Sequence, residues 1–233
     1  MIGTIINIVT ILIGGTIGLI FGSRIPEKLK TTVIAGMGLF TAAMGLQMFL
    51  KSENQLIVLG ALILGALSGE LLGIEDRLQL LGQALEKRFS KDEEKGTGSN
   101  FIRGFMVSSL LFIIGPMAIL GSIQDGLTGD YNLLAVKSTL DGFASVAFAS
   151  TLGIGVMFSS IIVLIYQGGI SLLAAQLSTI VTDPMMNEMT ATGGVLLLGL
   201  GISNLLDIKK IRVGNFLPAL LFAPLIVWIV SLF

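Results

Sequence analysis

Lys137 and Asp141 are charged residues of opposite sign, four positions apart in an otherwise apolar stretch of the chain. On a helix this spacing places the two side chains on one face, where they can form an ion pair. Within a membrane helix, the Asp141 carboxylate could bind a cation or a proton, with Lys137 competing for it. The alternative is a structural pair near the membrane surface, in which the Lys137 ammonium reaches water.

Glu70 is a second acid within an apolar stretch, and it lies near the end of that stretch. We treat it as a candidate ion- or substrate-binding residue, because ionisable side chains in membrane helices are rare and mark ion pathways. The alternative is a carboxylate that reaches lipid headgroups or a nearby arginine.

The segment Gly121–Asp130 carries oxygen ligands on Gln124, Asp125, Thr128 and Asp130. Their spacing is not that of an EF-hand loop. We predict a polar turn outside the membrane, and the alternative is a turn in which Asp125 and Asp130 capture a cation.

Gly115, Pro116 and Pro224 are predicted helix breaks within apolar stretches. Proline removes a helical hydrogen bond and clashes with the preceding turn. Broken helices at corresponding positions of two halves point to the binding site of a transporter. A simple kink that packing accommodates is the alternative.

The elements that must position these residues are membrane helices. Hydrophobic residues make up 53% of the 233 residues and charged residues 12%, against about 45–50% and about 25% in soluble domains. The net charge of −1 leaves no electrostatic footprint for nucleic acid. The chain has no cysteine or histidine and no P-loop motif. We therefore expect no metal, no cofactor and no enzyme activity.

We predict an all-α polytopic membrane protein with about eight spans of about 20 residues each. The predicted spans are 3–22, 31–50, 55–73, 102–121, 133–152, 155–177, 190–206 and 213–233. The fifth and sixth are nearly continuous, so the alternative is seven spans with one re-entrant segment.

Basic residues gather in the loops 23–30, 74–101 and 207–212. The positive-inside rule places these loops in the cytoplasm and both termini outside. Apolar residues recur at helical spacing between Glu75 and Phe89, which predicts an amphipathic helix along the membrane surface. The polar stretch Ser90–Asn100 predicts a mobile linker, and the alternative is an ordinary solvated loop.

Two segments match at a constant shift in residue number, GALILGALSGELLGI (60–74) and GVLLLGLGISNLLDI (194–208). The same shift pairs Asn7 with Asp141 and Glu70 with Asn204, so each pair holds one acid and one amide. We hypothesise that both pairs line a central path. The match predicts two parallel four-helix repeats, 1–121 and 122–233. The alternative is a chance match between glycine-rich helices. Glycine-rich faces of this kind pack closely, either within one chain or between copies in a homo-oligomer.

A family resemblance rests on IGTIINIVTILIGGTIG at the N-terminus, on GALSGE, and above all on FIIGPMAILGSIQDGLTGDYNLLAVKSTLDGFASVAFASTLG (112–153). The later TATGGVLLLGLGISNLL and the run 215–220 agree with it. Across essentially the whole chain, these segments resemble the YdfK/YqgA family of uncharacterised bacterial membrane proteins. The resemblance implies a protein of the bacterial cytoplasmic membrane.

The function we infer from these features is a secondary transporter or permease that moves a small solute or ion across the lipid bilayer. An ion channel is one alternative, and it predicts steady conductance without a coupled ion. A membrane scaffold or a subunit of a larger complex is another, and it predicts that Asp141 and Glu70 tolerate amide replacement.

Overall fold

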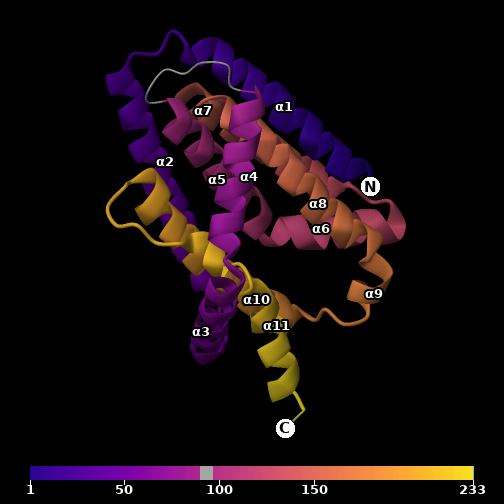
Figure 1. Ribbon diagram of the computed structural model, residues 1–233. Helices are drawn as coiled ribbons and strands as arrows, with labels where there is room; N and C mark the ends of the chain where they lie inside the picture. Colours follow the sequence, from indigo (N-terminus) through magenta and orange to yellow (C-terminus); the bar gives the residue numbers. More distant parts are fainter. Residues whose placement is uncertain (90–96, 233) are drawn as a thin grey trace. The chain divides into compact units, whose positions relative to one another are not determined.

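The computed structural model describes residues 1–89 and 97–232, and this part of the chain is helical, without a strand (Figure 1). Helices suit a bilayer because they satisfy every backbone polar group internally. The elements are α1 (Ile2–Gly22), α2 (Glu27–Phe49), α3 (Gln55–Leu72), α4 (Ile74–Phe89), α5 (Thr97–Ile114), α6 (Pro116–Thr128), α7 (Asn132–Leu152), η1 (Ile154–Phe158), α8 (Ser159–Leu172), α9 (Ala174–Ser178), α10 (Asp183–Leu200), η2 (Gly201–Leu205), η3 (Val213–Phe216) and α11 (Ala219–Val230).

Six of these helices are long and apolar enough to cross a membrane, and the bent pair α5–α6 would add a seventh span. The six are α1, α2, α3, α7, η1 with α8, and η3 with α11. The predicted count of eight is not confirmed, because α10 is not among them. Its first half carries the polar residues Asp183, Asn187 and Glu188.

The helix predicted for 102–121 is two helices. α5 ends at Ile114 and α6 begins at Pro116, with a bend of 63° between them. Gly115 and Pro116 therefore break the helix, as predicted, because Pro116 has no N–H to continue α5 and suits the first position of a new helix. α6 continues to Thr128, so the polar turn predicted for 121–130 is wrong over most of its length.

Pro224 does not break its helix, and that prediction is wrong. α11 runs through Pro224 from Ala219 to Val230. One missing hydrogen bond is tolerated in a membrane helix with closely packed neighbours, and the adjacent Ala223 is fully buried. The regular helix is interrupted earlier, by a turn at Leu217 and Pro218 between η3 and α11.

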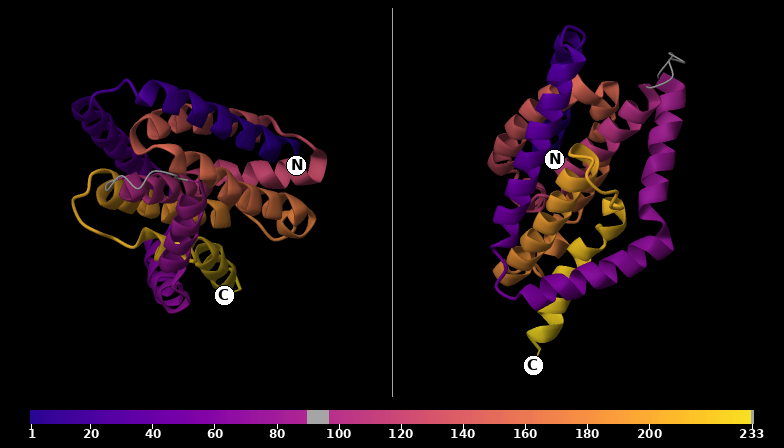
Figure 2. Two further views of the ribbon diagram at one scale, coloured as in Figure 1. Left: turned by 45° about the horizontal axis from the view of Figure 1, so that its top comes forward. Right: turned by 90° about the vertical axis from the view of Figure 1, so that its left-hand side faces the viewer.

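Two glycines with positive φ separate neighbouring helices. Gly73, at φ 59°, ends α3, and the chain turns a corner into α4 (Figure 2). α4 confirms the helix predicted between Glu75 and Phe89. Gly153, at φ 83°, ends α7, so the predicted fifth and sixth spans are separate helices. Of the predicted linker Ser90–Asn100, residues 90–96 lie outside the described residues, and 97–100 begin α5.

The chain divides into two compact units, each with segments from both predicted halves. The first unit comprises residues 1–35, 79–113 and 117–179. In it, α1 and α7 lie side by side and run in the same direction (Figure 1). A Cβ on Gly18 would lie 2.9 Å from the Ala149 Cβ, and one on Gly22 would lie 2.6 Å from the Ser150 carbonyl oxygen. Glycine at four-residue intervals thus allows the two backbones to approach closely.

The second unit comprises residues 36–78, 114–116 and 180–233. α3 and α11 run in opposite directions here, and a Cβ on Gly65 would lie 2.6 Å from Ala219. α10 carries Glu188, whose carboxylate accepts hydrogen bonds from the Ser52 hydroxyl at 2.7 Å and from the backbone N–H groups of Glu53 and Asn54 at 2.7 and 2.8 Å. These donors belong to the turn that precedes α3, where Asn54 is the N-cap residue, so Glu188 fixes this turn from a distant part of the chain.

Candidate functional site

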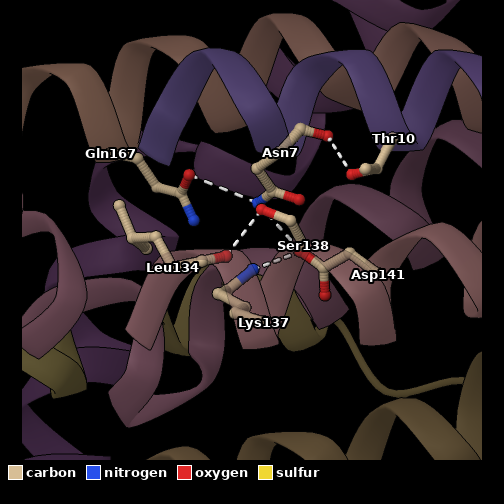
Figure 3. A network of polar contacts seen from close by, with 7 residues as sticks. All are labelled: Asn7, Thr10, Leu134, Lys137, Ser138, Asp141 and Gln167. Carbon is tan, nitrogen blue, oxygen red and sulfur yellow. Dashed lines mark hydrogen bonds and ion pairs between the residues drawn. The ribbon is translucent and has the colours of Figure 1, made fainter. Parts of the chain in front are cut away.

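Lys137 and Asp141 form an ion pair on α7 (Figure 3). Lys137 is 5% exposed and Asp141 is 8% exposed. The Lys137 ammonium also lies 5.9 Å from the ring centroid of Phe112 on α5, a cation–π distance. The pair is therefore enclosed by protein, and the alternative in which the ammonium reaches water is wrong.

Asn7 on α1 connects this pair to α8. Its Nδ2 donates to Oδ2 of Asp141 at 3.0 Å and to Oε1 of Gln167 at 3.3 Å. Figure 3 shows the Asn7 side chain between Gln167 and the α7 residues. The structure thus brings Asn7 and Asp141 together, as the constant shift between the two predicted halves indicates. Asn7 and Gln167 are both fully buried.

Several buried polar atoms around this network have no hydrogen-bond partner among the described residues. In the first unit they include Asn7 Oδ1, Gln167 Nε2 and the hydroxyls of Thr4, Ser122, Ser145 and Ser171. Buried polar groups in native proteins are nearly always paired with protein, water or a ligand. Of these atoms, Asn7 Oδ1 and Gln167 Nε2 belong to the network itself, so the network has hydrogen-bonding capacity left for a further partner.

Asp125 lies on α6 and turns inward, instead of forming part of an outer loop. Its Oδ2 accepts a hydrogen bond from the backbone N–H of Gly3 at 3.0 Å, and its Oδ1 lies 3.1 Å from the Met1 amino group. Its side chain has no exposed surface. Asp130, in contrast, is exposed, and its Oδ1 accepts from the backbone N–H of Asn132 at the start of α7. Asp125 is therefore buried at a helix contact, whereas Asp130 stabilises an exposed turn, and the two acids do not form one site.

Glu70 belongs to a different cluster, in the second unit. Its Oε1 accepts from Arg212 at 2.5 Å and its Oε2 from the Asn215 amide. Arg212 also pairs with Asp76 at 2.5 Å, and this hydrogen bond raises the pKa of the guanidinium above its ordinary value. The structure therefore supports the alternative in which Glu70 pairs with a nearby arginine. This pair is open to solvent, since the side chains of Arg212 and Glu70 are 43% and 59% exposed.

An open groove of about 430 Å³ lies beside Glu70. Its lining comprises Ala66, Leu67, Glu70, Leu71, Arg212, Asn215 and Phe216. Asn204 lies in the π-helical turn η2. The hydrogen-bond partners of Glu70 are Arg212 and Asn215. The pairing of Asn204 with Glu70 stays a prediction.

Two further contacts join residues at the same shift as Asn7 and Asp141, 134 positions apart. In the second unit, the Asn187 amide donates to Oε1 of Glu53 at 2.7 Å, and the backbone N–H of Asn54 donates to Oε1 of Glu188 at 2.8 Å. Like Asn7 and Asp141, each of these pairs holds one acid and one amide.

Sequence reasoning missed Gln167 as part of the site, Thr4 as a buried hydroxyl, and Glu188 as the acceptor for the turn before α3. Gln167 is the one amide in the apolar stretch of α8, and that isolation is a signal that could have found it. Thr4 carries no such signal, because a threonine bonds readily to its own helix backbone and is common in membrane helices.

The chain belongs to the family described as "Protein of unknown function (DUF554)", which it matches over residues 2–228. It is 33% identical, over 237 residues, to the "Uncharacterized membrane protein YdfK" of Bacillus subtilis (strain 168), covering 100% of this chain and 98% of that protein. It is 34% identical, over 223 residues, to the "Uncharacterized protein YqgA" of Escherichia coli (strain K12), covering 96% and 94%. No solved structure matches the chain significantly. The predicted family is therefore confirmed.

Proposed function

We propose that this protein is a secondary transporter that moves a small solute or ion across the bacterial cytoplasmic membrane. The observation that carries the proposal is the network of Asn7, Lys137, Asp141 and Gln167, which is buried among candidate spans. Charged and amide side chains inside a bilayer are energetically unfavourable, so evolution retains them mainly where they bind or conduct something.

Two features support transport over a purely structural role. The α5–α6 break resembles the discontinuous helices that form transporter sites. The contacts between residues 134 positions apart fit two parallel repeats, because a residue near a pseudo-two-fold axis meets its own counterpart. We propose eight spans, with α10 and η2 as part of the eighth, and the loops 23–30, 74–101 and 207–212 in the cytoplasm.

Solute-jump currents test this function. The full chain is reconstituted into liposomes on a solid-supported membrane, and currents are recorded after jumps of H⁺, Na⁺, K⁺ and a panel of amino acids, carboxylates and nucleobases. We expect a transient, saturable current for at least one of these probes. Asp141→Asn should remove most of it, because the amide cannot carry the charge of the carboxylate.

Glu27→Gln is the matched control, since the Glu27 side chain is 86% exposed and pairs with Lys30 on its own helix. Its current should equal that of the wild type. Folded wild-type protein that gives no current with any probe would contradict the proposal. A steady, non-saturating current would indicate a channel instead.

A further inference from the structure

A line of buried polar groups joins Asp125 to Asp141 within the first unit. Thr4 and Asn7 lie one helical turn apart on α1, and both are fully buried. Ser122 and Asp125 share one face of α6, and Gln167 and Ser171 share one face of α8. Each helix thus turns its polar positions towards the same interior, whereas its remaining positions are largely apolar.

Close contacts bring α1, α6, α7 and α8 together at one end. The side chain of Leu134, at the start of α7, lies against both Gly3 of α1 and Gly121 of α6, since a Cβ on either glycine would come within 2.8 Å of it. Gly126 of α6 lies against the backbone of Ser171 on α8. Thr4 and Ser122 directly follow the two glycines that meet Leu134, so both residues lie at the level where α1, α6 and α7 come together.

We propose that this line is a proton path, which leads from Asp125 through the hydroxyls of Thr4, Ser122 and Ser171 to Asp141. This inference rests on the proposed transport function and names its coupling ion. Ser122 lies one helical turn from Asp125 on α6, and Thr4 lies one helical turn from Asn7 on α1. Side chains at this spacing start about 5–6 Å apart, a gap that one bridging water spans. Each hydroxyl and each water accepts one proton and releases another, so a proton that binds Asp125 reaches Asp141 without net change in between.

The groups that face the two acids fit a proton better than a metal ion. Oδ2 of Asp141 already accepts from both Lys137 and Asn7. A metal ion such as Ca²⁺ would have to displace that ammonium and gather about 6–8 oxygen ligands. A proton needs only one carboxylate oxygen. It converts Asp141 to the acid and releases Lys137 from its partner, while at Asp125 the facing groups are the Met1 amino group and the Gly3 N–H.

Infrared difference spectroscopy during a pH titration tests the path on the full chain in lipid nanodiscs. A carboxylic acid has a C=O stretch that a carboxylate lacks, so protonation of each buried acid produces its own band. We expect two such bands, one absent in Asp125→Asn and the other absent in Asp141→Asn. After a rapid pH jump, the Asp141 band should appear more slowly in Thr4→Val, by on the order of tenfold or more.

Thr16→Val is the control, because Thr16 is exposed on the same helix and its hydroxyl already donates to the Leu12 carbonyl. Its rate should equal that of the wild type. A titration in which no band depends on Asp141, or a rate that Thr4→Val leaves unchanged, would overturn the path. A solute current without an Asp141 band removes the proton path and leaves the transport function intact. Normal bands without any current support the path and contradict transport.

Discussion

Removal of the Lys137 charge should strongly destabilise the protein. Methionine is similar in length to lysine, so Lys137→Met keeps the packing but leaves the Asp141 carboxylate without its ammonium partner. Breaking a buried ion pair by removing one partner costs about 3–5 kcal/mol. We expect the lower half of that range, because Asn7 still donates to Asp141 at 3.0 Å. The double variant Lys137→Met/Asp141→Leu buries no charge and should unfold with a free energy close to that of the wild type.

The free energy of unfolding can be measured by titrating the protein with sodium dodecyl sulfate in mixed micelles. Lys30→Met provides the control, because it breaks an ion pair whose Glu27 carboxylate is largely exposed. Exposed pairs contribute at most about 1 kcal/mol. If Lys137→Met loses no more stability than Lys30→Met, the reasoning from burial is wrong. The same reasoning would be refuted if the double variant were as unstable as Lys137→Met. The attraction between the two charges, and not the cost of an unpaired buried carboxylate, would then account for the lost stability.

Three further predictions concern a close helix contact, a set of hydrogen bonds and an exposed ion pair. Gly18→Val should destabilise the protein by about 1–3 kcal/mol through overpacking against α7. Gly36→Val is the control and should have little effect, because a Cβ at Gly36 meets nothing within 4 Å. Thermal unfolding in detergent compares the two variants. Glu188→Ala removes three hydrogen bonds to the turn before α3 and should cost about 2–4 kcal/mol, given a net contribution of about 0.5–1.5 kcal/mol for each hydrogen bond. Hydrogen exchange should show fraying at that end of α3 alone. Glu70→Gln should change the unfolding free energy by less than about 1 kcal/mol, because the ion pair of Glu70 with Arg212 is exposed. A larger loss of unfolding free energy would mean that the pair is shielded from water when the protein is in a membrane.

Local features of the candidate site could be predicted because they depend on one helix. Lys137 and Asp141 are four residues apart, so any helix through them brings their side chains together. Pro116 breaks its helix because it has no N–H to continue α5 and because the preceding Gly115 is conformationally permissive. Pro224 has the same chemistry but remains within α11, since its neighbours tolerate one missing hydrogen bond.

The sequence by itself determined that the chain is a helical membrane protein, because composition and the length of apolar stretches suffice for that. The constant shift between the two matching segments also predicted the pairing of Asn7 with Asp141, and the structure contains that hydrogen bond. Only the tertiary structure decided that Asp125 and Gln167 turn inward and that Glu188 accepts hydrogen bonds from the turn before α3. The physical reason is that lipid and protein interior are equally apolar, so the sequence of a membrane helix scarcely marks which of its faces meets another helix.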